Sequence, residues 1–132
     1  GFVGDANTWG GRVSEVRGDE VRVETDTSLP MICTARSGAL SSGQPVRIFV
    51  RPEFVEARRL DAPADRPEGV NSLTGKVDSV LFNGANSRVL VRGPAGELIE
   101  ASVTVTGGTR DLHAGDAVRL TWSAAQSICF AA

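Results

Sequence analysis

The sequence predicts an all-β chain built from one strand pattern that occurs twice. Short runs rich in Val, Leu and Ile alternate with polar residues, and 15 glycines and 6 prolines separate these runs. A period of two is typical of strands that bury one face, and Gly and Pro are typical of the turns between strands. No window keeps a 3.6-residue period, so we expect no helix longer than a turn or two.

The two halves of the chain match each other block by block. Residues 11–16 match 75–80, residues 21–23 match 89–91, and residues 43–50 match 115–122. The spacing between matched blocks grows along the chain, as insertions in surface loops allow. We therefore expect a first β repeat over 1–60 and a second over 72–132, joined by the Pro-rich, charged linker 61–71.

The first strand of each repeat breaks the period of two at the same place. Val13 and Val16 are three residues apart, and so are Val77 and Val80. In a regular strand these side chains would point to opposite faces, whereas a β-bulge would let both point inward. We predict a bulge in both first strands, as a strongly curved strand of a small barrel requires.

The number of strands indicates the kind of barrel. Each half supplies about five strands, as in the partly open Greek-key barrel of the OB type. An isolated half of ~50–60 residues would be only marginally stable. We therefore expect two OB-like units that are packed against each other or interleaved.

Composition argues against several classes of protein. The net charge is −2, aromatic residues make up 5% of the chain, and Tyr is absent. Nucleic-acid binders usually carry a basic face and aromatic stacking residues. No run of ~20 apolar residues could span a bilayer, and no basic-then-apolar signal segment opens the chain. Cys33 and Cys129 are most simply two buried thiols, although a single bridge between them stays open.

No residue pattern predicts catalysis or metal binding. Residues 69–77 resemble a phosphate-binding loop, but five residues separate the glycines and Val77 follows Lys76, where Ser or Thr would hold Mg²⁺. His113 is the only histidine, so there is neither a zinc-ligand cluster nor a nucleophile–base pair. We expect no catalytic, cofactor-binding or metal-binding residue, and we expect that this chain is not itself an enzyme.

The bend after residue 50 is the most distinctive local feature. Pro52 follows an apolar strand directly, and proline there forces a bend or a strand edge. Arg51 and Glu53 flank it. They could form a local ion pair, or they could present a fixed charged pair to a partner or ligand.

Taken in order, these features resemble the transport-associated OB, or TOBE-type, domain at the C-terminus of ABC-transporter ATP-binding subunits. The likeness is strongest to subunits of polyamine, ferric-iron and related importers, and it covers essentially the whole chain. The motifs that carry it are Phe2-Val3-Gly4-Asp5 with Asn7, Gly11-x-Val13, Val50-Arg51-Pro52-Glu53, Gly75-x-Val77, Phe82-Asn83-Gly84, Leu112-x-x-Gly115-Asp116-x-Val118 and Trp122.

The resemblance implies a non-catalytic regulatory domain. Its ATPase would lie N-terminal and hold ATP and Mg²⁺, so a chain that starts at Gly1 without Met is expected to be part of a longer subunit. The implied partners are a second copy of the chain, that ATPase domain and, indirectly, the permease subunits. The implied location is cytoplasmic, peripheral to the inner membrane. Arg51, Glu53, Asn83 and Gly84 are the candidate contacts with a partner or a small ligand.

Two other functions stay open. One is a small-ligand or oxyanion binder that uses backbone amides in turns such as 107–109. The other, less favoured, is an OB-type nucleic-acid binder.

Overall fold

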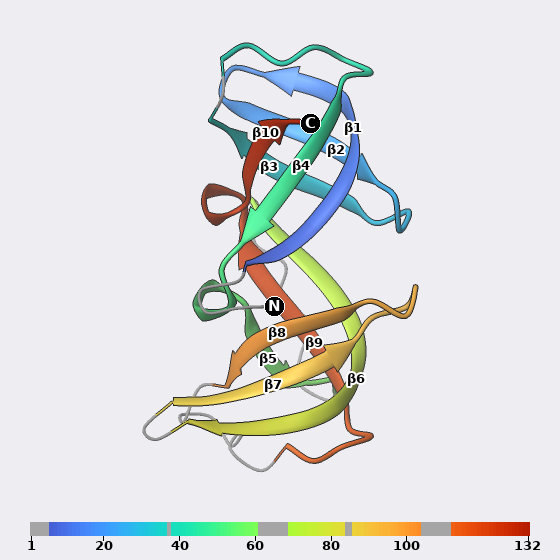
Figure 1. Cartoon of the computed structure of the whole chain (residues 1–132), viewed down its shortest axis with the longest axis vertical. Coiled ribbons are helices and arrows are strands. Elements are labelled where there is room, and N and C mark those ends of the chain that lie inside the picture. Colours follow the sequence, from blue (N-terminus) through green and yellow to red (C-terminus); the bar gives the residue numbers. More distant parts are fainter. Residues whose placement is uncertain (1–5, 37, 61–68, 84–85, 104–111) are drawn as a thin grey trace. The chain divides into compact units, whose positions relative to one another are not determined.

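The computed structural model describes residues 6–36, 38–60, 69–83, 86–103 and 112–132. These residues form strands joined by turns and two short 3-10 helices (Figure 1). They fold into two compact units, and each unit contains a closed five-stranded barrel. The all-β prediction with two OB-like barrels is confirmed.

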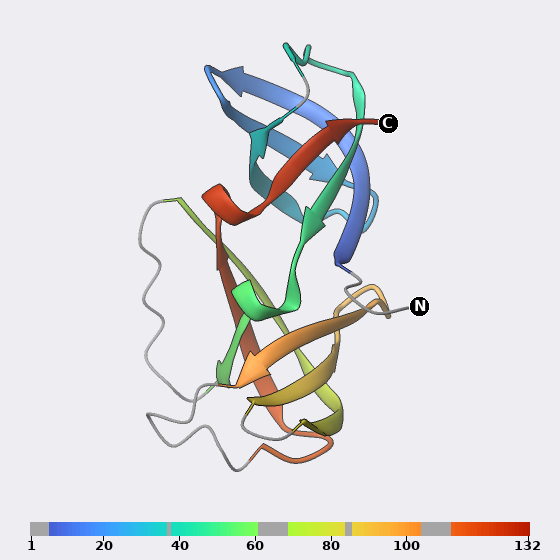
Figure 2. The ribbon, with the colours of Figure 1, turned by 60° about the vertical axis from the view of Figure 1, so that its left-hand side comes forward.

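The first unit comprises residues 1–51, 68–71 and 123–132. Its barrel has the strand order β1-β2-β3-β10-β4 (Figure 1). The strands are β1 (Asn7–Arg17), β2 (Glu20–Thr25), β3 (Pro30–Ala35), β4 (Pro45–Val50) and β10 (Ile128–Ala131). Strand β10 runs antiparallel to β4 and parallel to β3, and thereby closes the barrel (Figure 2).

The second unit comprises residues 52–67 and 72–122. Its barrel has the strand order β5-β8-β7-β6-β9. The strands are β5 (Glu56–Arg59), β6 (Val70–Asn83), β7 (Asn86–Arg92), β8 (Leu98–Val103) and β9 (Ala117–Ser123). Strand β5 runs parallel to β8 and antiparallel to β9, so it has the role that β10 has in the first barrel.

The compact units do not coincide with the sequence repeats 1–60 and 72–132. Each barrel takes its closing strand from the other repeat, because the chain leaves β4 and β9 through the 3-10 helices η1 (Pro52–Phe54) and η3 (Ala124–Gln126). As a result β5 does not pair with β4, and β10 does not pair with β9. In the expected linker, residues 61–68 lie outside the described residues, and β6 already begins at Val70.

Matching hydrogen bonds show that the two closing strands are equivalent. In the first barrel the Thr34 hydroxyl donates to the Ala124 carbonyl (2.9 Å). In the second, the Ser102 hydroxyl donates to the Pro52 carbonyl (3.2 Å). The residue that follows each 3-10 helix also accepts a bond from the parallel neighbour, since Thr34 N donates to Ser127 O and Ser102 N to Val55 O.

The predicted bulge is present in both first strands. The pairing register shifts between Val13 and Glu15 in β1, and between Val77 and Ser79 in β6. Val13 and Val16 both pair with fully buried valines of β2, so both face the inside of the barrel. Val16 still keeps 39% of its surface exposed, because it lies near the hairpin end of β1.

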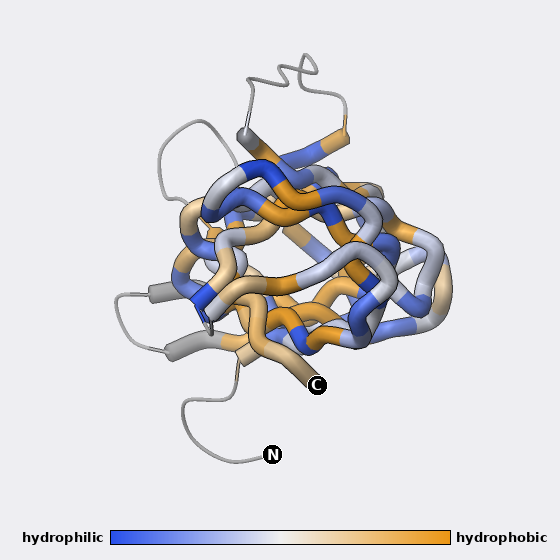
Figure 3. The backbone as a smooth tube through the Cα atoms, turned by 90° about the horizontal axis from the view of Figure 1, so that it is seen from above, coloured by the Kyte–Doolittle hydropathy of each residue, from blue (hydrophilic) through white to orange (hydrophobic). Residues whose placement is uncertain are grey.

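Each barrel has a core of mainly aliphatic side chains from the inward positions of its strands, with Trp9 buried in the first barrel and Trp122 in the second. Hydropathy alternates along the strands, as this packing requires (Figure 3). Gly11 and Gly75 lie where the curved first strands approach their neighbours too closely for a Cβ. A Cβ at Gly11 would lie 2.6 Å from Glu24 O, and one at Gly75 would lie 2.5 Å from Arg92 O. The curvature of β1 and β6 therefore depends on glycine at these positions.

Candidate interaction surface on the first barrel

The four candidate contact residues lie at different places in the fold. Arg51 follows β4 in the first unit, and Glu53 lies in η1 in the second; both side chains are exposed. Neither forms a salt bridge with another described residue. Asn83 ends β6, where it pairs with Asn86. Gly84 and the turn 107–109 lie outside the described residues, so a contact role for them stays a prediction.

The outer face of the first barrel carries an apolar group on β4 and on the closing strand β10. The rings of Phe49 on β4 and Phe130 on β10 meet edge to face, with centroids 5.6 Å apart and an interplanar angle of 79°. Ile128 lies directly opposite Phe49 on the neighbouring strand. Phe130 is 39% exposed, and Phe49 and Ile128 are half-buried. Aromatic residues that stay accessible in this way are typical of contact surfaces.

Three exposed arginines surround this apolar group. Arg47 lies directly opposite Phe130, and Arg51 directly follows β4, two residues after Phe49. Arg36 follows β3, and its backbone amide donates to Cys129 O (3.1 Å), which places it beside β10. None of the three forms a salt bridge with another described residue. We call Phe49, Ile128, Phe130, Arg36, Arg47 and Arg51 the aromatic–arginine patch.

One carboxylate lies beside the patch. Gly10 pairs with Arg47, and a Cβ at Gly10 would be 2.7 Å from Asp26 Oδ2. Asp26 therefore lies over the part of β1 that neighbours Arg47, without a salt bridge to it. Counted over the described residues, the patch and Asp26 together keep a net positive charge, on a chain whose overall charge is −2.

The same face of the second barrel is polar. Because the registers match, Thr121 takes the place of Phe49, Arg119 that of Arg47, Glu56 that of Ile128 and Arg58 that of Phe130. Arg58 Nε and Glu56 Oε1 are 2.5 Å apart, so these two charges compensate each other and Arg119 is the one arginine of the four positions left without a described salt-bridge partner. The aromatic–arginine patch therefore belongs to the first barrel and is not a general property of this scaffold.

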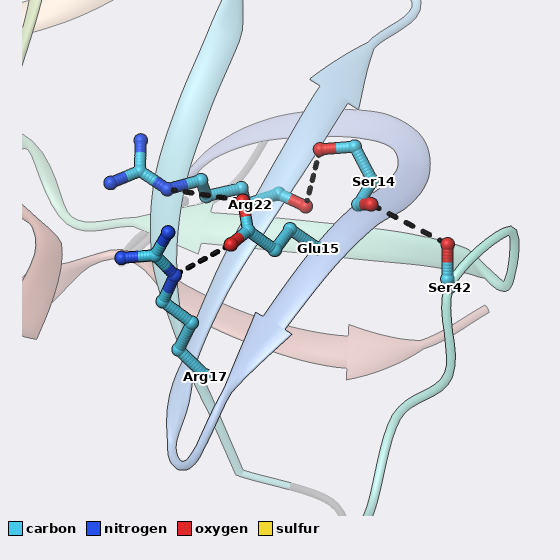
Figure 4. A network of polar contacts seen from close by, with 5 residues as sticks. All are labelled: Ser14, Glu15, Arg17, Arg22 and Ser42. Carbon is cyan, nitrogen blue, oxygen red and sulfur yellow. Dashed lines mark hydrogen bonds and ion pairs between the residues drawn. The ribbon is translucent and has the colours of Figure 1, made fainter.

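A polar network occupies the bulge side of the first barrel (Figure 4). Glu15 lies between two arginines: Arg17 Nε is 2.5 Å from Oε2, and Arg22 Nε is 3.9 Å from Oε1. The terminal nitrogens of both guanidinium groups point away from Ser14 and Ser42 (Figure 4). These side chains are exposed, so each ion pair adds little stability. The arrangement nevertheless places two guanidinium groups side by side at the protein surface, with Glu15 between them.

The two cysteines are buried thiols of low reactivity. Cys33 and Cys129 are free and fully buried. Burial raises the pKa of both thiols, that of Cys129 to about 11, and the proximity of Cys129 raises the pKa of Cys33 further. Among the residues that the structure describes, no three His, Cys, Asp or Glu side chains gather to hold a metal ion. No helix in the described part of the chain is long and apolar enough to cross a membrane.

Comparison with known proteins identifies the family. The TOBE domain model matches residues 48–130, which is more than half of the chain. The chain belongs to the TOBE domain family. The resemblance found in the sequence is confirmed to that extent, while an ABC-type ATPase as the parent protein stays a prediction. No curated protein sequence matches the chain.

The solved structures that match this TOBE chain include the cytoplasmic molybdate-binding protein ModG, crystallised with molybdate bound. The TM-score is 0.83, the sequence identity is 22%, and the match covers 97% of each chain. At this identity the likeness shows the fold alone. ModG and this chain share the architecture of two barrels in tandem.

One feature of the sequence could have indicated the patch: an aromatic residue at a strand position that faces outward. Phe49 lies at an outward position of β4, between Arg47 and Arg51, where period two predicts a polar residue. Phe130 also lies at an outward position, on the last strand, opposite Arg47. An aromatic residue at an outward position is the feature that could have drawn attention to both.

Proposed function

We propose that this chain is the C-terminal regulatory and dimerisation domain of an ABC-importer ATP-binding subunit, non-catalytic by itself. The importer would carry a polyamine, iron or a related small solute. The observation that carries the proposal is membership of the TOBE domain family, together with the ordered motifs from Val50-Arg51-Pro52-Glu53 to Trp122. ATP and Mg²⁺ would be bound by the N-terminal ATPase domain, on the cytoplasmic side of the inner membrane.

The geometry suits a domain that makes contacts and does no chemistry. The patch lies on and next to paired strands of a closed barrel, so its backbone is already ordered before a partner binds. The two buried thiols are held protonated and cannot act as nucleophiles near neutral pH. Within the described residues, then, the accessible chemistry is that of a protein-contact surface.

The dimerisation part of the proposal is tested on the natural full-length subunit. We expect sedimentation equilibrium to show a dimer whose association weakens when the TOBE domain is deleted, while each remaining ATPase domain still hydrolyses ATP. Equal association of the intact and the shortened subunit would contradict a dimerising role. Loss of hydrolysis on deletion, with the ATPase domain still folded, would contradict a purely regulatory one.

A second candidate function is oxyanion binding. Two observations favour it: the fold is that of a protein crystallised with molybdate bound, and Arg17 and Arg22 direct their terminal nitrogens to one side of Glu15 (Figure 4). Paired guanidinium groups are suitable donors for tetrahedral oxyanions. The shared carboxylate and the exposure of the site predict weak binding.

Calorimetric titration with molybdate, sulfate and phosphate tests this second candidate. Binding should disappear in Arg17→Ala and in Arg22→Ala. Arg58→Ala is the matched control, because Arg58 also holds a glutamate two residues before it on an exposed strand. No heat of binding at millimolar anion, or equal binding by all three variants, would exclude this site.

A further inference from the structure

We propose that the aromatic–arginine patch binds an acidic segment of another protein, in which apolar side chains alternate with Asp or Glu. This inference deepens the proposed function, since it names the chemistry of the partner at the regulatory contact. The apolar part of the segment would cover Phe49, Ile128 and Phe130. Its carboxylates would pair with Arg36, Arg47 and Arg51.

Charge complementarity carries the proposal. The apolar group lies on β4 and β10, and the three arginines lie on β4 or directly after β3 and β4. None of them has a salt-bridge partner among the described residues. Asp26 is the acidic group that lies next to Arg47, on the β1 side. A guanidinium beside an apolar surface gains most from a carboxylate when the contact excludes water, because the local dielectric constant falls.

The comparison between the two barrels supports selection for this chemistry. At the equivalent outer positions, the second barrel has Thr121 and an internally compensated Glu56–Arg58 pair. The scaffold therefore folds without the two aromatics, and of the two arginines at these positions only Arg119 lacks a salt-bridge partner among the described residues. The fold therefore does not require the two aromatics and three arginines of the first barrel. Binding of an acidic, apolar partner explains why they are there.

A second copy of this chain fits the patch less well. In a two-fold contact the same surface meets itself, so three arginines of one copy would face three of the other. Like charges placed together across an interface cost several kcal/mol. Dimerisation of the subunit is therefore expected to use a different surface.

A single-stranded nucleic acid also fits less well. Its bases need open aromatic faces on which to stack. Here Phe49 is half-buried, and the edge of one phenyl ring packs against the face of the other. The patch thus offers an apolar surface for aliphatic or aromatic side chains more than a platform for bases.

The test is an NMR titration of this chain with three short synthetic peptides that have blocked ends. The first alternates Leu and Phe with Asp and Glu, the second replaces each acid with Lys, and the third replaces each apolar residue with Ser. We expect the first alone to shift the amide signals of 46–51 and 128–131. Its affinity should fall about tenfold in Arg47→Glu and fall with salt between about 0.05 and 0.5 M NaCl.

Arg119→Glu is the matched control, because Arg119 has the position of Arg47 in the second barrel. We expect it to change the affinity by less than about twofold. Phe130→Ala should weaken binding as Arg47→Glu does, and a thermal melt of each variant shows whether it is folded.

Four results would overturn the proposal. They are no shift at β4 and β10 with the acidic apolar peptide, equal binding of the lysine peptide, binding of oligothymidine without binding of the acidic peptide, and conversion of a dimer to a monomer by Phe130→Ala. Because the titration needs no ATPase, its outcome is independent of whether the chain belongs to a transporter subunit.

Discussion

Phe49 and Phe130 come from different halves of the sequence, yet their rings pack edge to face on adjacent strands, with centroids 5.6 Å apart. The contact exists because β10, which ends the second repeat, closes the first barrel against β4. It follows that the strand exchange also builds the surface on which we expect a partner to bind.

This ring contact predicts a measurable coupling. Edge-to-face pairs contribute about 0.5–1.5 kcal/mol beyond burial of their area. A double-mutant cycle of Phe49→Ala and Phe130→Ala, followed by urea unfolding, should give a coupling energy in that range. Phe49→Ala combined with Val16→Ala is the control and should be additive. Additive effects in the first pair would mean that the rings do not interact in solution.

The curvature of β1 predicts a contrast between two neighbouring glycines. Gly11→Ala brings a Cβ against the backbone of Glu24 and Thr25, at 2.6 and 2.9 Å, and should cost about 1–3 kcal/mol of unfolding free energy. At Gly10 the obstacle is the flexible carboxylate of Asp26, so Gly10→Ala should lie within about 1 kcal/mol of the parent. Equal losses in the two variants would show that β1 does not approach β2 so closely.

A buried amide at the start of β6 predicts a second stability effect. The Asn71 side chain accepts a hydrogen bond from Ile32 N (2.8 Å), and it donates to Ile32 O (2.9 Å) and to Ser127 Oγ (3.1 Å). Asn71→Ala should cost about 3 kcal/mol, because it leaves buried polar groups without partners. Thr74→Ala, at an exposed position of the same strand, should be nearly neutral. A loss below about 1 kcal/mol in Asn71→Ala would indicate that water replaces the amide.

The buried thiols predict a loss of stability in alkali. An ordinary thiol titrates near pH 9.0, whereas burial raises the pKa of Cys129 to about 11 and that of Cys33 higher still. Below pH 9 both the folded and the unfolded chain keep these protons, so stability is complete. Above pH 9 the unfolded chain loses them first, so the free energy of unfolding falls, by up to about 1.4 kcal/mol per pH unit for each thiol.

The composition makes this alkaline effect easy to isolate. The chain has no Tyr, and Lys76 is its only lysine. Urea unfolding between pH 8 and 11 should therefore show a slope that a Cys33→Ala/Cys129→Ala double variant lacks. If the variant and the parent have the same slope, the thiols are not the groups responsible.

Local features of the fold were predictable from the sequence. The spacing of Val13 and Val16, and of Val77 and Val80, is sufficient to predict the two bulges, because a bulge lets residues three apart face one side of a strand. The repeated blocks likewise predict two barrels of the same design. Such features depend on neighbours along the chain.

The exchange of closing strands was not predictable in the same way. Alternation in 128–131 indicates a strand, but it does not say whether β4 or β9 is its partner. The pairing partner is set by the direction that the chain takes after η1 and η3. The patch was missed for the same reason, since Phe49 and Phe130 become neighbours only after the exchange.

The most direct measurement for the proposed regulatory domain is the coding sequence immediately upstream of Gly1. We expect an in-frame ABC-type ATPase domain, with its phosphate-binding loop and signature motif, continuous with this chain. An in-frame stop codon directly before the start of this chain would contradict it.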